Sequence, residues 1–299
     1  MKRYVKILFV ICFFTFYPTN THANEQLFVS AEHAILFEQS TGNILFEKNA
    51  HEKTSVASIT KVMTAIIALE YGILNEVVEV SERALNVEGS SIYLLENEKM
   101  TLKDLLYGLI LRSGNDAAIA ISEHIGGSVE AFVYLMNEKA KWIGMTNTNF
   151  QNPHGLEEEN HYSTAYDMAL LYRYASENEL FQSISNTKAY LSENRIYKWH
   201  NKNKLLTSLY EYSTGGKTGF TKKAGRTLIS SAEKGDLSLI AVTLNAPDDW
   251  RDHMRMFEWG FQQNHLTSFQ LHDHGVYDRS LYSLIKSNFR DLLGLYHYD

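Results

Sequence analysis

The chain of 299 residues is 44% hydrophobic and 21% charged, and its formal net charge at neutral pH is −7. An acidic chain argues against nucleic acid as a partner, and the hydrophobic content is sufficient for one large core or two small ones. The sequence has only three prolines and no Ser/Gly-rich or charge-block stretch, so no linker between domains stands out.

Residues 1–23 have the pattern of a cleaved secretory signal. A basic start, MKRYVK, precedes an apolar stretch, ILFVICFFTFYP, and the small-residue ending THA. The apolar stretch is shorter than a membrane-spanning helix needs, although an uncleaved N-terminal anchor is the alternative. Cleavage after Ala23 predicts an exported chain of 276 residues, acting at the cell wall or at the outer face of the cytoplasmic membrane. Loss of Lys2, Arg3 and Lys6 changes the formal charge from −7 to −10.

The only cysteine, Cys12, lies within this predicted signal. The mature chain therefore has no thiol, which excludes a disulfide framework, thiolate catalysis and cysteine-ligated zinc. The histidines form no His-x-x-x-His pair, and we expect no metal and no other cofactor.

The first elements are a β-hairpin and then helices. Residues 34–49, AILFEQSTGNILFEKN, form two β runs around a Ser-Thr-Gly-Asn turn. From Ser58 to residue 69 the apolar residues keep helical spacing, with Ser58 as the N-cap or a first-turn residue. A second helix is expected over 101–112, where Thr101 and Asp104 have capping-box spacing.

The motif SGN (113–115) interrupts this second helix, and a helix resumes over 116–126 with Asn115 or Asp116 able to cap it. An amphipathic helix follows at 129–144, and the Pro-, Gly- and charge-containing stretch 152–162 reads as a loop. The next helix is expected over 163–178, again with capping spacing, at Thr164 and Asp167.

From residue 187 the pattern changes to strands. A hairpin, three β runs and a closing helix are expected, at 188–199, 215–221, 225–233, 236–246 and 248–263. Strands at both ends with helices between and after them predict an α+β fold, in which helices and a helical insert accompany an antiparallel sheet. The two ends of the chain must then meet across that sheet.

Three short motifs occur in a fixed order, and each alone is weak. S-x-x-K occurs at Ser58, Ser185, Ser231 and Ser283, S-x-N at Ser113, Ser176 and Ser192, and K-T-G only at Lys217. Only Ser58 begins a long apolar helix after a hairpin, and only Ser113 lies in a break between two apolar helices. Three motifs in this order, each at a suitable break, favour function over accident.

The spacing of Ser58 and Lys61 suits nucleophilic catalysis. A serine hydroxyl is a poor nucleophile until a base takes its proton, and residues i and i+3 share a helix face. Burial and a second cation at Lys217 would lower the pKa of Lys61 toward the neutral amine that a base needs. The N–H groups at the start of the helix would stabilise an oxyanion.

The other motif residues suit an extended substrate that ends in a carboxylate. Ser113 can relay a proton between Lys61 and the leaving group, and Asn115 can hold a substrate amide. The stretch 217–221 is expected to bind substrate. Lys217 and Thr218 offer a cation and a hydroxyl for the carboxylate, and Gly219 lets the strand pair with an extended substrate. The N–H of Phe220 could stabilise the oxyanion, and Thr221 completes the predicted stretch. Together these parts predict acyl transfer through a serine ester.

The phrases ASITKVMTA, LLYGLILRSGNDAA, NPHGL, STAYDMALL, NKNKLL and WRDHMRMFEWGF extend this likeness beyond the three motifs. From about Ala34 to Phe261 the chain resembles the low-molecular-mass penicillin-binding proteins that are serine-type D-alanyl-D-alanine carboxypeptidases. The resemblance implies the β-lactamase/transpeptidase-like fold, a five-stranded antiparallel sheet with a helical cluster. It also implies that Ser58 is acylated by peptidoglycan stem peptides ending in D-Ala-D-Ala, and by β-lactams.

By this resemblance the catalytic domain is 24–263, and 264–299 is a short C-terminal extension, too short for the second β-rich domain of many relatives. Its segment 280–298 has an amphipathic helical face that could lie on a membrane, although weak basic bias favours packing against the core. Phe220 replaces a histidine of some relatives, which bears on pH behaviour.

Three further residues in or near these phrases are not expected to be catalytic. His154 is expected to be structural, and Asp167 to cap or position a helix rather than to catalyse. Arg251 is a candidate for binding a carboxylate, but an arginine exposed on a helix usually has no such task.

Two rival functions remain. A class A β-lactamase shares the motif order, but it needs a glutamate and an asparagine that drive water onto the ester. Residues 157–160, EEEN, lie in the right region without the E-x-x-L-N pattern. A non-catalytic protein that binds the cell wall or senses β-lactams would be expected to lose Lys61 or Lys217, and both are present.

Overall fold

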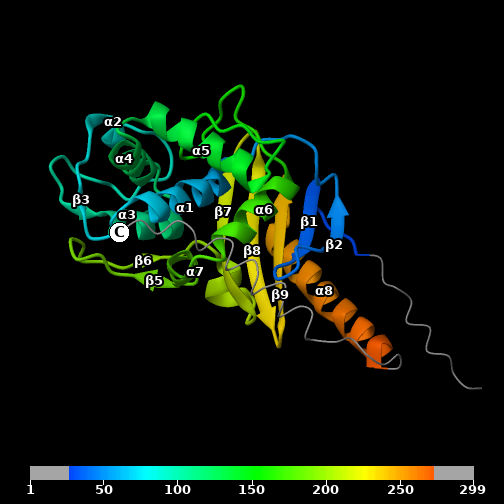
Figure 1. Ribbon diagram of the computed structural model, residues 1–299. Helices are drawn as coiled ribbons and strands as arrows, with labels where there is room; N and C mark the ends of the chain where they lie inside the picture. The colour runs from blue at the N-terminus through cyan, green and yellow to red at the C-terminus, as the bar shows by residue number, and fades with distance from the viewer. Residues whose placement is uncertain (1–26, 273–299) are drawn as a thin grey trace, which may run out of the picture.

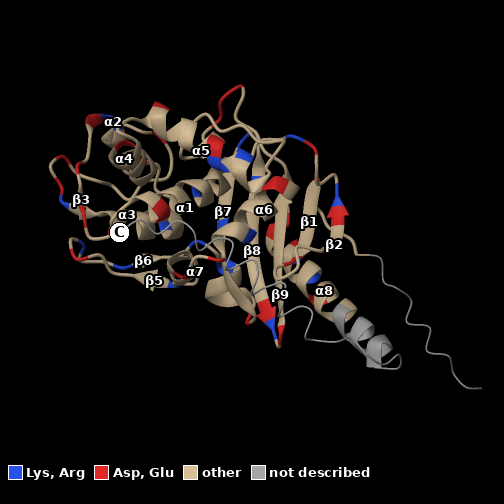
Figure 2. Ribbon diagram, in the orientation of Figure 1, with Lys and Arg blue, Asp and Glu red and all other residues tan. Residues whose placement is uncertain are grey.

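The computed structural model describes residues 27–272, with side chains described as far as residue 263. The predicted signal (1–23) and the predicted helix over 280–298 lie outside the described residues. In the view of Figure 2, acidic and basic residues are interspersed along the ribbon, and the lysines and arginines do not gather on one element.

A five-stranded antiparallel sheet forms the centre, with strand order β2-β1-β9-β8-β7. Its strands are β1 (His33–Glu38), β2 (Ile44–Lys48), β7 (Ser213–Thr221), β8 (Gly225–Lys234) and β9 (Leu237–Leu244). The predicted hairpin and the three predicted C-terminal β runs are all in this sheet. His33 pairs with Leu244, so the two ends of the described fold meet across the sheet as predicted. β7 lies at the edge, so one side of its backbone pairs with no other strand of this sheet.

The helices are α1 (Lys61–Tyr71), α2 (Glu82–Leu85), α3 (Leu102–Tyr107), α4 (Asn115–Gly126), α5 (Val129–Ile143), α6 (Ala165–Ala175), α7 (Glu179–Ser185) and α8 (Asp249–His272). A 3₁₀ turn, Ala57–Thr60, precedes α1, and single π-helical turns occur at Gly108–Arg112 and Leu205–Leu209. Two minor two-stranded sheets pair β3 (Val77–Val78) with β4 (Met100–Thr101) and β5 (Ala189–Tyr190) with β6 (Trp199–His200).

The central sheet is covered on both faces. In Figure 1, α6 and α1 lie on one side of the sheet and α8 on the other, while α2 to α5 form the helical lobe. Alternate side chains of β1 point to opposite faces of the sheet. Ile35 and Phe37 join the core shared with the helical lobe, whereas Leu36 is in the core that contains Phe257 of α8. Because both faces of β1 are covered, its four central residues are all apolar instead of alternating with polar ones.

The structure changes the predicted boundaries of two helices. The helix expected over 101–112 is α-helical only in α3, and its last turn is π-helical from Gly108 to Arg112. The closing helix continues beyond residue 263 to His272. The hairpin expected over 188–199 is confirmed, although its paired part is only β5 with β6.

Both predicted threonine caps are confirmed. The hydroxyls of Thr101 and Thr164 accept the backbone N–H groups of Asp104 and Asp167 at the starts of α3 and α6. The carboxylate of Asp167 also accepts the N–H of Asn147, so it ties this helix to the preceding loop. This is the positioning role expected for Asp167.

Candidate active site

Ser58 and Lys61 lie at the start of the helical lobe, where the chain leaves the sheet. Ser58 is in the 3₁₀ turn and Lys61 is the first residue of α1, and the Lys61 Nζ lies 3.0 Å from the Ser58 Oγ. The predicted contact across three residues is therefore present, although Ser58 does not act as a side-chain cap. The residue before it, Ala57, has φ +50, a left-handed conformation that non-glycine residues adopt at a cost.

Lys61 is fully buried and has two further acceptors. Its Nζ lies 2.6 Å from the carbonyl oxygen of His154 and 2.7 Å from the Oδ1 of Asn115. Burial lowers the pKa of Lys61 well below its ordinary value, and the positive charges of Lys217 and Lys202 lower it further. The predicted effects of burial and of Lys217 are both present, and they favour the neutral amine.

The three contacts of Lys61 fit the amine of a general base. A neutral amine has two N–H groups and one lone pair, and the carbonyl oxygens of His154 and Asn115 can only accept hydrogen bonds. Both N–H groups are therefore directed to these oxygens, and the lone pair faces the hydroxyl of Ser58. A protonated Lys61 has three N–H groups for the same three oxygens, so proton transfer from Ser58 requires no rearrangement around Lys61.

Asn115 is fixed at both ends of its side chain. Its Oδ1 accepts from Lys61, and its Nδ2 donates to the carbonyl oxygen of Glu88 at 2.7 Å. It does not cap α4, whose N-cap position is Gly114. The neighbouring Asp116 accepts the N–H groups of Ala117 and of the loop that precedes α3. Asn115 therefore positions Lys61, and its role toward a substrate amide stays a prediction.

The loop 152–158 holds the His154 carbonyl against α1. Thr64 of α1 donates to the carbonyl of Pro153, and the Oδ1 of Asn152 accepts the N–H of Gly155. The imidazole of His154 accepts the N–H of Leu156, and burial lowers its pKa to about 3. The imidazole is therefore neutral and structural, as expected, whereas the contact of the His154 carbonyl with Lys61 was not predicted.

Ser113 is bound to Lys217 rather than to Lys61. The Lys217 Nζ donates to the Ser113 Oγ at 3.0 Å and to the carbonyl oxygen of Thr218 at 2.7 Å. Both side chains are buried, and burial, followed by the charge of Lys202, lowers the pKa of Lys217 to about 7. Ser113 has φ +63 after the π-helical turn. The second and third motifs thus meet directly, in the predicted break between the helices.

Gly219 brings β7 against the turn that carries Ser58. A Cβ at Gly219 would lie 2.9 Å from the Ser58 nitrogen and 2.3 Å from the Thr227 Oγ1. Thr227 in turn donates to the carbonyl of Val56, so β8 also holds this turn in place. Only a residue without a side chain permits this approach. The backbone next to Phe220 is consequently close to Ser58.

A cavity of about 370 Å³ opens at Ser58, between the helical lobe and the β7–β8 end of the sheet. It is lined by three serines, four cationic or acidic side chains and the 218–220 stretch with a tryptophan: Ser58, Ser90, Ser113, Lys202, Lys204, Arg226, Asp249, Thr218, Gly219, Phe220 and Trp250. Lys61, Asn115 and Lys217 lie beneath this surface. The Thr221 hydroxyl instead accepts the N–H of Ala224 in the β7–β8 turn.

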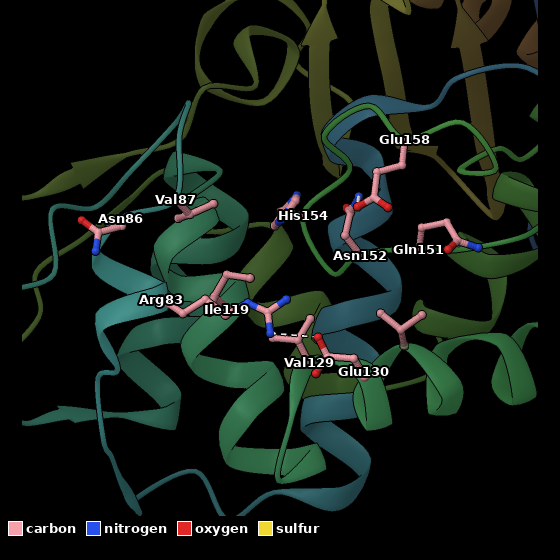
Figure 3. A pocket seen from close by; sticks show the side chains of 11 residues that line it. Arg83, Asn86, Val87, Ile119, Val129, Glu130, Gln151, Asn152, His154 and Glu158 are labelled. Carbon is pink, nitrogen blue, oxygen red and sulfur yellow. Dashed lines mark hydrogen bonds and ion pairs between the residues drawn. The ribbon is translucent and has the colours of Figure 1, made fainter.

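A second cavity, of about 570 Å³, is lined by residues of α2, α4, α5 and the 151–158 loop (Figure 3). His154 forms part of its wall, and the ion pair of Arg83 and Glu130 crosses its outer side. Both charged side chains are more than half exposed, so this pair contributes little to stability. The two cavities have no lining residue in common, and we assign the substrate to the one that contains Ser58.

The family model described as D-alanyl-D-alanine carboxypeptidase matches residues 19–248. D-alanyl-D-alanine carboxypeptidase DacF of Bacillus subtilis is 40% identical over 259 residues, which cover 82% of this chain and 67% of the relative. The enzyme DacC of Escherichia coli is 36% identical over 266 residues, covering 83% and 66%. The chain thus spans about two thirds of the length of these two relatives.

Solved structures show the same fold. A crystal structure of D-alanyl-D-alanine carboxypeptidase from Mycobacterium tuberculosis superposes with a TM-score of 0.75 at 29% identity, covering 79% of this chain and 92% of that one. The predicted fold, a five-stranded antiparallel sheet with a helical cluster, is confirmed. Within the part of the chain that the structure describes, no helix combines the length and apolar composition that crossing a bilayer requires.

Proposed function

The chain belongs to the D-alanyl-D-alanine carboxypeptidase family, and we propose that it removes the terminal D-alanine of peptidoglycan stem peptides through an ester on Ser58. The observation that carries this proposal is the contact of Ser58 with a buried amine whose two N–H groups already have acceptors. Such an amine can only accept a proton from the hydroxyl.

In the acylation step, Lys61 takes the proton of Ser58 as the Oγ attacks the carbonyl carbon of the penultimate residue. The C–N bond to the terminal D-alanine then breaks, and the leaving nitrogen takes a proton. Ser113 accepts from Lys217, so its own O–H can donate to that nitrogen. The proton that Lys61 took from Ser58 then replaces the one that Ser113 gave up, which leaves both groups as they were before the second step. Water attacks the ester in the second step, and its proton restores the hydroxyl of Ser58.

The backbone around Ser58 supports the developing oxyanion. The N–H groups of Ser58 and Phe220 belong to the two segments that Gly219 brings together, and they are the two donors that we propose. The substrate would run along the open edge of β7 as an added strand. β-lactams would acylate Ser58 by the same route and leave slowly, because the ester then blocks the cavity.

The β-lactamase alternative is not favoured by the loop glutamates. Glu157 accepts the N–H of Lys223 at the β7–β8 turn, and Glu158 accepts from the Nδ2 of Asn152 and lines the second cavity. Both carboxylates therefore have partners in their own surroundings. A carboxylate that activates water would have to face the ester on Ser58.

Release of free D-alanine from a peptide ending in D-Ala-D-Ala tests the function. Ser58→Ala should abolish release, and Ser208→Ala, at an exposed serine, should leave it unchanged. Labelled penicillin should remain attached to the parent chain and not to Ser58→Ala. A correctly folded parent chain that releases no D-alanine would support the wall-binding alternative, and rapid penicillin turnover would support a β-lactamase.

Export is part of the same proposal, because the substrate lies outside the cytoplasm. Cell fractionation of the full chain, with and without residues 2–23, would test it, and protein that stays in the cytoplasm with the segment present would contradict it. Membrane contact through 280–298 stays a prediction, to be checked by sedimentation of the full chain with anionic vesicles.

A further inference from the structure

We propose that Arg226 of β8 is the cation that binds the terminal carboxylate of the substrate, and that Asp249 and Trp250 hold its guanidinium in position. The inference rests on the proposed function, since it names the group that recognises one end of the same substrate. The motif order suggests Lys217 as the cation that binds the carboxylate, and the present inference assigns that role to Arg226 instead.

Lys217 is poorly placed to meet a carboxylate in the cavity. Its side chain is 2% exposed, and its Nζ is bound to the Ser113 hydroxyl and the Thr218 carbonyl. It does not line the cavity at Ser58, whereas the neighbouring Thr218 does. A lysine in this position acts on Ser113, and the substrate carboxylate needs another partner.

Strand register places Arg226 beside the substrate stretch of β7. Arg226 pairs directly with Phe220, and Thr218 is two residues before Phe220 on the same strand. Because side chains alternate between faces, Thr218, Phe220 and Arg226 share one face of this hairpin, and the side chain of Lys217 is on the other. Thr218, Phe220 and Arg226 all line the cavity that contains Ser58.

The guanidinium of Arg226 is held by two neighbours at the start of α8 that also line the cavity, Asp249 and Trp250. Its Nε and Nη2 contact the Oδ1 of Asp249 at 2.9 and 2.8 Å, and its Cζ lies 5.4 Å from the ring centroid of Trp250. Asp249 is 2% exposed, so it is a fixed anchor at the start of α8. The ion pair does not use Nη1, which leaves an amino group of a planar donor for a carboxylate.

The other cations near the cavity are less suitable. Lys202 donates to the Ser90 hydroxyl, and Lys204 is an exposed ammonium on a flexible stem. Arg251, the carboxylate candidate suggested by the sequence, pairs with Asp248 three residues earlier on an exposed part of α8. Arg226 is thus the cation of this wall that is both anchored and beside Thr218.

Binding of matched ligands tests the assignment without catalysis. In the Ser58→Ala background, calorimetry would measure the Kd of a stem-peptide mimic ending in D-Ala-D-Ala and of its C-terminal amide. We expect the acid to bind more tightly, and Arg226→Gln to weaken the acid about 10- to 100-fold with little effect on the amide. Arg226→Lys should recover part of the loss, and Asp249→Asn should weaken the acid selectively, with a smaller effect.

Lys204→Gln is the matched control, since it removes a cation from the same cavity, and it should change the acid and the amide equally. Equal losses of acid and amide in a folded Arg226→Gln protein, or selective loss in Lys204→Gln instead, would overturn the assignment. Failure of the proposed function would show separately, as absence of D-alanine release by the parent chain.

Discussion

The Nζ of Lys61 lies 2.6 Å from the backbone carbonyl of His154, the shortest of its three hydrogen bonds. The position of the Lys61 amine is therefore set in part by a loop that is distant in sequence. Changes in that loop should alter catalysis by displacing a carbonyl group, and this can be separated from general destabilisation.

Gly155→Ala should inactivate the protein. Gly155 has φ +84, and a Cβ there would lie 1.9 Å from the carbonyl oxygen of Ala57, in the turn that carries Ser58. Overpacking together with a left-handed alanine should cost more than about 2 kcal/mol of stability. Penicillin acylation rates and urea denaturation measure the two effects.

Gly144→Ala is the control for backbone strain, because Gly144 has φ +92 and open space around it. It should cost about 1 kcal/mol and leave acylation unchanged. Equal effects of the two substitutions on acylation would show that the loop does not position the base.

In the pH profile of the acylation rate, Lys202→Gln should move the rise on the acidic side (the acid limb) to higher pH. The charge of Lys202 lowers the pKa of Lys61, so its removal raises that pKa. Only the neutral amine accepts the proton of Ser58, so a higher pH is then needed for the same rate. The pH dependence of penicillin acylation measures the shift.

Lys204→Gln removes a cation from the same cavity without removing one of the charges that act on Lys61. Its acid limb should coincide with that of the parent chain. A limb that moves to lower pH in Lys202→Gln would mean that Lys61 is not the group that titrates.

Gly219→Ala should slow acylation by about 100-fold, because a displacement of about 1 Å between reacting groups has effects of this size. The added Cβ would meet the Ser58 nitrogen and the Thr227 hydroxyl, so β7 must move away from the nucleophile. Stopped-flow acylation gives the rate, and circular dichroism checks the fold. Normal acylation would argue against the proposed oxyanion donor at Phe220.

His253→Gln should reduce the loss of stability in acid. His253 is buried beneath the sheet between the hydroxyls of Ser230 and Thr243, and burial lowers its pKa from 6.5 to about 3. Between these pH values the unfolded chain binds more protons, so the free energy of unfolding falls as pH falls below about 6.5. Each such histidine contributes up to about 1.4 kcal/mol per pH unit.

Glutamine keeps a donor and an acceptor for the two hydroxyls but does not titrate. Urea denaturation at several pH values should therefore show a shallower slope in the variant, while His154 and His161 still contribute in the same direction. An unchanged slope would mean that His253 does not exchange a proton on unfolding.

The sequence predicted the elements and contacts that depend on short spacing. Ser58 and Lys61 meet because three residues of helical backbone fix their separation, whatever the rest of the fold does. The π-helical turn at Gly108–Arg112 was not predicted, because one extra residue in a turn hardly changes an apolar pattern. That turn nevertheless precedes the left-handed Ser113 and so sets where its hydroxyl points.

Long-range contacts of the backbone could not be predicted from residue types. The carbonyl groups of His154 and Glu88 hold the base and Asn115, and every residue carries such a group, so no pattern marks them. Arg226 had a usable signal: counting across the turn after Thr221 places it opposite Phe220. Composition alone does not show which face of that hairpin borders a cavity.

The pairing of β1 with β9 has a consequence for biogenesis. His33 can pair with Leu244 only after residue 244 has been synthesised. The sheet therefore cannot form completely while the later strands are still being made. Contacts this distant along a chain form slowly. A newly synthesised copy would thus stay open until residue 244 has been made, which would suit the export that we propose, since an exported polypeptide is threaded unfolded through a translocation pore.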